Sequence, residues 1–93
     1  MSRNESCVDN EIIRRIITMG GWAHKVHGNQ YNTAEPDIDG CLDGVSIKVE
    51  SKKLGRDADP LQRMALERWR LAGAVTGVCH SVAEFDNLWE ARD

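Results

Sequence analysis

Hydrophobic and polar residues follow two different rhythms along this chain of 93 residues. The first is the helical spacing of the isoleucines in "IIRRII", residues 12–17, which predicts a helix from Glu11 to about Met19. Asp9 stands where a helix-capping residue is expected, and we expect residues 1–8 to form a loose start. The paired glycines that follow Met19 end the predicted helix.

The second rhythm is the alternation of apolar and polar residues that is typical of strands. The stretch "WAHKVHG", residues 22–28, alternates weakly and predicts a first strand. The stretch "DIDGCLDG", residues 37–44, predicts a short strand that turns between Gly40 and Gly44. It leads into a third predicted strand at Val45–Lys52, and these last two strands can pair as a hairpin.

The second half of the chain has clear helix-start signals. Asp59 followed by Pro60 combines a capping residue with a proline at the first helical position, and Gln62 has the spacing of a capping box. Helical periodicity then continues to Gly73. A largely apolar strand is predicted at residues 74–79.

A last helix is predicted over residues 81–92, where Ser81 and Glu84 have the spacing of a second capping box. The predicted order is therefore αβββαβα within one domain, residues 1–93. A helix between the third and fourth strands implies a crossover, so we expect an α/β fold with a mixed sheet flanked by helices. A chain of this length buries only about 60–65% of its unfolded surface, so association with a second copy would help its core.

The net charge is −3, from 12 Lys and Arg against 15 Asp and Glu. This balance is not that of a strongly basic, non-specific nucleic-acid binder, although carboxylates gathered in a metal site would lower the net charge of a binder too. Three widely spaced cysteines predict no disulfide framework and favour a reducing cytoplasm. The polar N-terminus leads us to expect no signal peptide, and no apolar run reaches the roughly 18–20 residues of a membrane span.

The strand at residues 46–53, "SIKVESKK", carries Glu50 and Lys52 on one face, about 6.6 Å apart along the strand. Asp37 follows Pro36 at the start of the preceding strand. If these two strands pair, both carboxylates can meet at one end of the sheet. Oxygen ligands of this kind suit Mg²⁺ or Mn²⁺, and a nearby lysine can stabilise charge on a phosphate in its transition state. Asp39 shares the strand face of Asp37, so spacing leaves open which of the two binds metal.

These motifs resemble the PD-(D/E)xK nucleases, and their order resembles the virus-type replication-repair nuclease (VRR-NUC) branch. The resemblance covers roughly residues 9–89. It rests on five motifs in order: Glu11 on a helix, "KVHGNQY" at residues 25–31, Pro36-Asp37, Glu50-x-Lys52, and Gln62 near the start of the next helix. One departure is Glu35, which adds a charge where the family often has glycine or a branched apolar residue.

The resemblance implies an endonuclease-like fold, dependence on Mg²⁺ or Mn²⁺, and a DNA phosphodiester substrate. Small stand-alone members of the branch are similar to Holliday-junction resolvases and work as homodimers, which implies branched DNA, a dimer, and the cytoplasm of a bacterial or phage-infected cell. The implied metal ligands are Asp37, Glu50 and the Ser51 carbonyl, with Glu11 acting through water. Lys52 is the implied catalytic lysine, and Gln62 holds Lys52 or the nucleic acid. The implied contacts to DNA are Lys25, His27, Lys53, Arg56 and Arg63.

Other interpretations of these residues remain open. A module that keeps the nuclease fold and binds nucleic acid, or serves assembly, without catalysis would share most of the pattern. Glu11 also suits the first turn of a helix through the helix dipole, and the capping box alone explains Gln62. The spacing of the histidines and cysteines matches no zinc pattern. We expect Trp22, Trp69 and Trp89 to lie in the core or an interface rather than to stack on bases.

Overall fold

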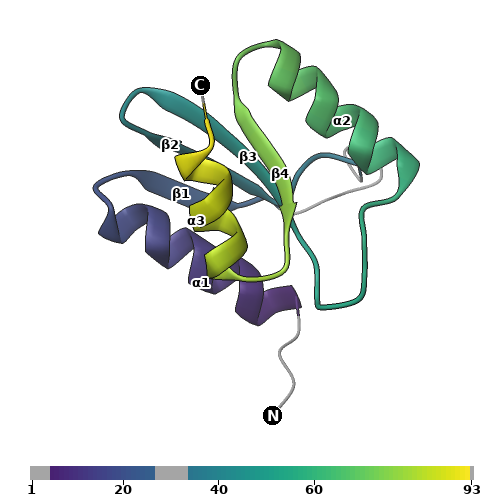
Figure 1. Ribbon diagram of the computed structural model, residues 1–93, viewed down its shortest axis with the longest axis horizontal. Helices are drawn as coiled ribbons and strands as arrows, with labels where there is room; N and C mark the ends of the chain where they lie inside the picture. Colours follow the sequence, from purple (N-terminus) through teal and green to yellow (C-terminus); the bar gives the residue numbers. More distant parts are fainter. Residues whose placement is uncertain (1–4, 27–33, 93) are drawn as a thin grey trace.

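The computed structural model describes residues 5–26 and 34–92. Within these residues the chain forms three helices and four strands in the predicted order αβββαβα. Their arrangement can be followed in Figure 1. The elements are α1 (Glu5–Thr18), β1 (Trp22–Lys25), β2 (Ile38–Leu42), β3 (Val45–Ser51), α2 (Pro60–Leu71), β4 (Val75–Cys79) and α3 (Val82–Glu90).

The four strands form one mixed sheet in the order β1-β2-β3-β4. Strand β2 runs antiparallel to both β1 and β3, and β4 runs parallel to β3 after the crossover through α2. In this register Ile38 pairs with Val49, and Ser51 pairs with Cys79. The mixed sheet that was predicted from the helix between the third and fourth strands is confirmed.

The predicted hairpin between β2 and β3 is present, and its turn is tighter than expected. Asp43 and Gly44 both have positive φ, at 53° and 77°, which is the backbone of the two-residue turns that suit twisted hairpins. Gly40, expected in the turn, instead lies within β2. A Cβ at Gly40 would stand 2.8 Å from the carbonyl oxygen of Trp22, so the close approach of β1 requires a glycine there.

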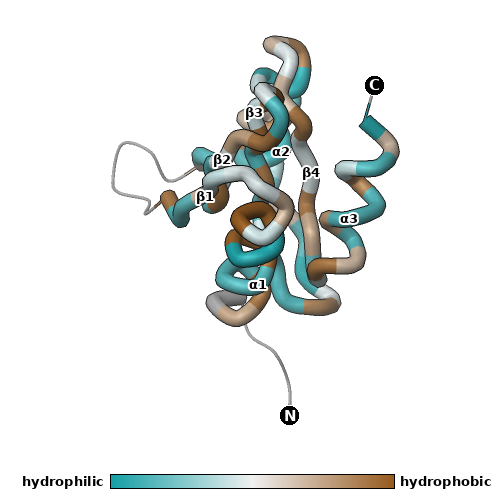
Figure 2. The backbone as a smooth tube through the Cα atoms, turned by 90° about the vertical axis from the view of Figure 1, so that its left-hand side faces the viewer, coloured by the Kyte–Doolittle hydropathy of each residue, from teal (hydrophilic) through white to brown (hydrophobic). Residues whose placement is uncertain are grey.

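Helices cover both faces of the sheet. Ile12 and Ile16 of α1 and Phe85 of α3 are fully buried against Ile47 and Val49, which point to one face of β3. The backbone view shows hydrophobic and hydrophilic residues alternating along α1, as this one-sided burial requires (Figure 2).

The opposite face of β3 meets α2. Lys48, which alternates with Ile47 and Val49, places its ammonium 4.0 Å from the ring centroid of Trp69 in α2. The sheet is therefore sandwiched between α1 with α3 on one side and α2 on the other.

Helix α1 begins earlier than predicted. It starts at Glu5, so a loose start over residues 1–8 is wrong for residues 5–8, and residues 1–4 lie outside the described part. Val8 is buried and extends the apolar stripe one turn before Ile12. Asp9 therefore lies inside the helix instead of capping it.

The two predicted capping boxes differ. At α2 the box is complete, with Gln62 N–H donating to Asp59 Oδ1 and Asp59 N–H donating to Gln62 Oε1, both at 2.9 Å. At α3, Glu84 N–H donates to Ser81 Oγ at 3.1 Å, but the Glu84 carboxylate accepts instead from His80 N–H at 3.0 Å. The second box is thus half formed, because Glu84 is bound to His80.

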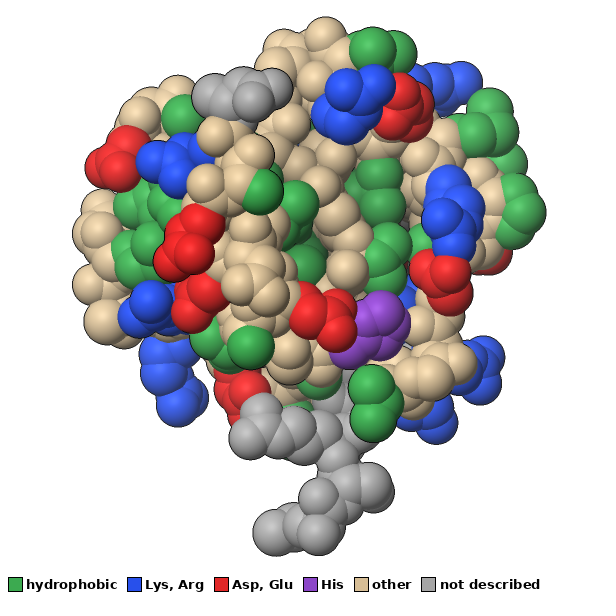
Figure 3. Space-filling view, in the orientation of Figure 1, with side chains coloured by type: hydrophobic (Ala, Val, Ile, Leu, Met, Phe, Trp, Pro, Cys, Tyr) green, Lys and Arg blue, Asp and Glu red, His purple; other side chains and the backbone are tan. Residues whose placement is uncertain are grey.

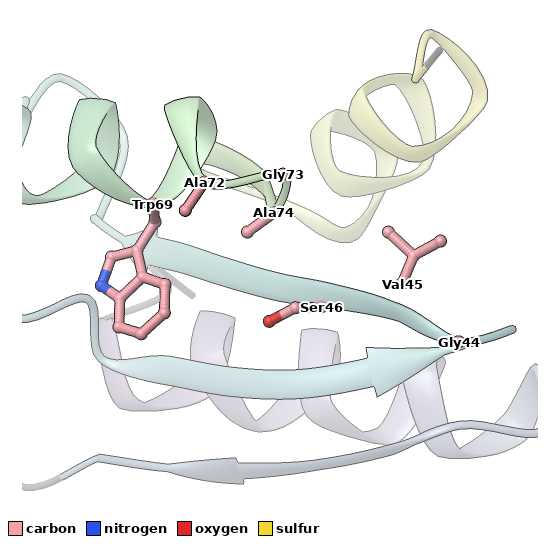
Figure 4. Close-up of a pocket in the computed structure, with 7 residues that line it drawn as sticks. All are labelled: Gly44, Val45, Ser46, Trp69, Ala72, Gly73 and Ala74. Carbon is pink, nitrogen blue, oxygen red and sulfur yellow. The ribbon is translucent and has the colours of Figure 1, made fainter.

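The tryptophans occupy three environments. Trp89 is buried in the core, whereas Trp22 is 69% exposed at the sheet edge and so lies outside the core of this chain. Trp69 reaches from α2 over β3 and borders a hollow of about 300 Å³ with Ser46 and Ala72 (Figure 4). None of the three cysteines, all of them in the described residues, forms a disulfide. Across the described residues, no helix is long and apolar enough to cross a membrane.

Candidate functional site

Asp37 stands directly before β2, and its carboxylate is bonded to the end of β3. Ser51 N–H donates to Asp37 Oδ1 at 2.8 Å, and the Ser51 hydroxyl donates to Oδ2 at 2.7 Å. Since Ile38 pairs with Val49, the positions of Asp37 and Glu50 face each other one step further along the ladder. The Pro-Asp and Glu-x-Lys segments are thus adjacent, as the predicted strand pairing requires.

Glu50 lies near the end of β3, and Lys52 directly follows the last residue of that strand. The Glu50 side chain is buried, with 5% of its surface exposed, and Lys52 is half-buried. Lys52 N–H donates to the Cys79 carbonyl at 3.0 Å, which continues the parallel ladder with β4 beyond Ser51. This bond holds the lysine backbone in strand register with Glu50, two residues earlier.

Helix α1 contributes a buried carboxylate that the sequence interpretation missed. Asp9 is 1% exposed, and its Oδ2 lies 2.9 Å from the ammonium of Lys25 at the end of β1. Its Oδ1 is buried and has no hydrogen-bond partner in the described residues. The available signal was helical spacing, because Asp9 lies three and seven residues before Ile12 and Ile16 and so falls on the buried face.

The charges around Asp37 favour the binding of a cation. Burial raises the pKa of the Asp37 carboxyl above its ordinary value, the two bonds from Ser51 lower it, and the nearby charge of Asp9 raises it again. Lys25 offsets this repulsion in part. Two acidic groups with one ammonium in a buried site leave room for further positive charge.

The donor set suits a hard divalent cation that keeps part of its water shell. In residues 5–26 and 34–92, no group of three or more His, Cys, Asp or Glu side chains is placed to hold a metal by itself. Mg²⁺, however, is commonly held by only one or two carboxylates with waters and substrate phosphates. Asp37 and Asp9 lie close enough for the charge of Asp9 to raise the pKa of Asp37, and the strand register places the backbone of Glu50 opposite Asp37. These three carboxylates, with the buried Asp9 Oδ1 that has no hydrogen-bond partner in the described residues, are the groups that would hold such an ion.

Asp39 is set apart from Asp37. Its Oδ1 lies 2.7 Å from Lys48 Nζ, and its Oδ2 lies 3.6 Å from His24 Nε2, on the sheet face that α2 covers. The strand alternation that put the two aspartates on one face does not hold at Asp37, which precedes β2 and turns to Ser51.

Two other sequence candidates have different neighbours, and a third lies outside the described residues. Glu11 borders a hollow with Arg15 and Val82. The Gln62 side chain is engaged with Asp59 in the capping box. His27 lies outside the described residues.

The candidate DNA-binding residues Lys53, Arg56 and Arg63 cluster on the connection between β3 and α2 and on the first turns of α2. All three are exposed. Arg63 forms an ion pair with Asp57 and donates from Nε to the Ala58 carbonyl at 3.2 Å. Figure 3 shows basic side chains spread over this face of the molecule, some of them at its lower right near a histidine and a hydrophobic side chain.

Comparison with known proteins supports the resemblance seen in the motifs. A scan of family models and a search of curated proteins both found no match. A solved structure described as a "VRR_NUC domain" superposes with a TM-score of 0.77 at 30% sequence identity. The match covers 94% of this chain and 95% of the other, so the two share their architecture over nearly their full length.

Proposed function

Because the chain belongs to the VRR-NUC family of nuclease domains, we propose that it is a metal-dependent DNA endonuclease that hydrolyses phosphodiester bonds. The observation that carries the proposal is the pair of hydrogen bonds from Ser51 to Asp37. They join the Pro-Asp and Glu-x-Lys segments at one end of the sheet. Both segments hold a carboxylate, and carboxylate oxygens are ligands that suit Mg²⁺ and Mn²⁺.

Asp37 and Glu50 would hold Mg²⁺ or Mn²⁺, with the Ser51 carbonyl as a further ligand. Asp9 takes the supporting role from α1 that the sequence suggested for Glu11, because Asp9 is the helix acid that is buried beside Asp37. When bound, such a cation lowers the pKa of a water molecule and polarises a phosphate.

The chain's own residues orient and balance this site. Ser51 fixes both oxygens of the Asp37 carboxylate, and Lys25 neutralises Asp9. Lys52, held in strand register beside Glu50, supplies positive charge toward the phosphate as negative charge develops on it. Gln62 supports this end of α2 through its capping box with Asp59.

The proposed substrate is structured or branched DNA, such as a four-way junction, bound by a homodimer. The dimer is supported by large apolar side chains that α2 leaves exposed, namely Leu61 at 64%, Met64 at 51% and Leu71 at 73%. A two-fold dimer would present two sites to a two-fold substrate, so that paired cuts become possible.

The test is a cleavage assay with purified protein on linear duplex, single strand, flap and four-way junction. We expect cleavage with Mg²⁺ or Mn²⁺ that EDTA abolishes, and binding with little turnover in Ca²⁺, which holds its ligands loosely. Full activity in EDTA would overturn the proposed mechanism. DNA binding without cleavage under every condition would instead identify the catalytically inactive nuclease-fold module.

A further inference from the structure

Leu54 is the most exposed large hydrophobic residue in the described part of the chain, with 87% of its surface open to solvent. It lies two residues beyond Lys52, the lysine of the Glu-x-Lys segment. Lys53 and Arg56, both exposed, stand on either side of it in the sequence. An apolar side chain held out between two cations, next to a candidate site for phosphate chemistry, calls for a specific explanation.

The backbone presents Leu54 at the apex of a tight turn. Arg56 N–H donates to the Lys53 carbonyl at 3.0 Å, which closes a four-residue turn over Leu54 and Gly55. Gly55 has a φ of 86°, the positive value that the third position of a type II turn requires. Figure 1 shows that the connection from β3 to α2 projects away from the sheet.

A histidine fixes the base of this turn. His80 Nε2 lies 2.6 Å from the Arg56 carbonyl, and Nδ1 lies 2.8 Å from Glu84 Oε1. Both partners are hydrogen-bond acceptors, so this geometry favours the protonated ring, which donates from both nitrogens. Consistent with this, the Glu84 carboxylate raises the pKa of His80 above its ordinary value. The turn is therefore fastened to the start of α3, and Leu54 extends from an anchored base.

On the premise of the proposed nuclease function, we propose that Leu54 is a wedge that inserts between bases of the bound DNA beside the cleaved phosphate. Apolar side chains that enter a base step unstack it, and the flanking cations contact phosphates while carrying no sequence information. The turn also borders a hollow of about 680 Å³, with Val78 and His80 among its other walls, which gives a displaced base room.

A wedge gives the substrate preference a physical origin. Unstacking a fully paired step costs free energy, and a step that is already open at a branch or an unpaired nucleotide avoids this cost. The protein should therefore bind DNA with an open step more tightly than the same DNA fully paired. Leu54, not the surrounding charges, should create that difference.

The experiment measures affinity in Ca²⁺ buffer for a duplex with one unpaired nucleotide and for its fully paired parent, with 2-aminopurine at the open step. Wild type should prefer the open duplex by about 10-fold, the size expected when a leucine side chain is largely buried. Leu54→Ser should remove the preference and the rise in 2-aminopurine fluorescence, and Leu54→Met should keep both. Ile17→Ser is the control, because it changes an exposed apolar residue of α1 that belongs neither to this turn nor to the apolar surface of α2.

Salt dependence separates the wedge from an ordinary contact. Leu54→Ser should leave the slope of log affinity against log salt unchanged, because it removes no phosphate contact, whereas Arg56→Ala should reduce it. A Leu54→Ser variant that retains the preference, or that loses equal affinity for both duplexes, overturns the wedge and leaves the nuclease function standing. Absence of any DNA binding by the wild type overturns both.

Discussion

Replacement of Ser51 by alanine removes one of the two hydrogen bonds that Ser51 donates to Asp37 and leaves the other in place. The hydroxyl bond to Asp37 Oδ2, 2.7 Å long, is lost, and the backbone bond to Oδ1, 2.8 Å long, remains. Ser51 is 1% exposed, so bulk water has little access to replace the lost donor. The change therefore tests how firmly the strand end holds the carboxylate.

The magnitude follows from the charge and burial of the acceptor. A hydrogen bond to a charged group contributes about 1.5–3 kcal/mol, and we expect Ser51→Ala to lower the free energy of unfolding by that amount. At roughly 4–8 °C per kcal/mol for a domain of this size, the melting temperature should fall by about 10 °C or somewhat more. Ser46→Ala, on an exposed position of the same strand, should change stability by less than about 0.5 kcal/mol.

The assay is urea unfolding of wild type, Ser51→Ala, Asp37→Ala and the double variant. The double-mutant cycle should give a coupling energy of about 1–3 kcal/mol between the two side chains. A coupling energy near zero, or a Ser51→Ala variant as stable as Ser46→Ala, would refute the view that Ser51 fastens the Asp37 carboxylate.

Three further predictions concern catalysis, pH and assembly. Lys52→Ala should slow single-turnover cleavage by roughly 10²–10³-fold with little change in DNA affinity, and Lys53→Ala should leave the chemical step nearly unchanged. If Lys52→Ala weakens DNA binding as much as it slows cleavage, Lys52 does not act in the transition state. The contact between His80 and Glu84 raises the pKa of His80 and lowers that of Glu84, so it stabilises the fold fully between pH 4.5 and 6.5, and the stabilisation is lost as pH rises through the higher folded-state pKa of His80. The free energies of unfolding of His80→Gln and wild type should therefore converge at alkaline pH, and a difference that stays constant with pH would exclude this linkage. Light scattering should show a dimer at micromolar concentration, and a persistent 10.4 kDa monomer would contradict it.

Local chemistry made much of the fold predictable. The start of α2 follows from Asp59-Pro60 with Gln62, because both halves of a capping box lie within four residues of sequence. The β2–β3 hairpin follows from two alternating segments that join at Asp43 and Gly44. Such signals depend on neighbours in the chain and need no knowledge of tertiary contacts.

The start of α1 and the role of Asp9 were not predictable in the same way. An aspartate before a stripe of isoleucines can either cap a helix or lie inside it. Only the packing of Val8 in the core, a tertiary contact, shows that the helix begins before Asp9. The contact between Ser51 and Asp37 could not be predicted from strand alternation, because alternation points the Ser51 side chain to the opposite face from Glu50. It forms because Asp37 precedes β2 and is not held to that strand's alternation.

The most direct test of the account is single-turnover cleavage of DNA in Mg²⁺ or Mn²⁺ by Asp37→Asn, with Asp39→Asn as its matched control. The two residues lie in one segment, but Asp37 is bound to Ser51 at the proposed metal site, whereas Asp39 is bound to Lys48. We expect Asp37→Asn to lose cleavage while retaining its fold, and Asp39→Asn to cleave at close to the wild-type rate. An active Asp37→Asn together with an inactive Asp39→Asn would contradict it.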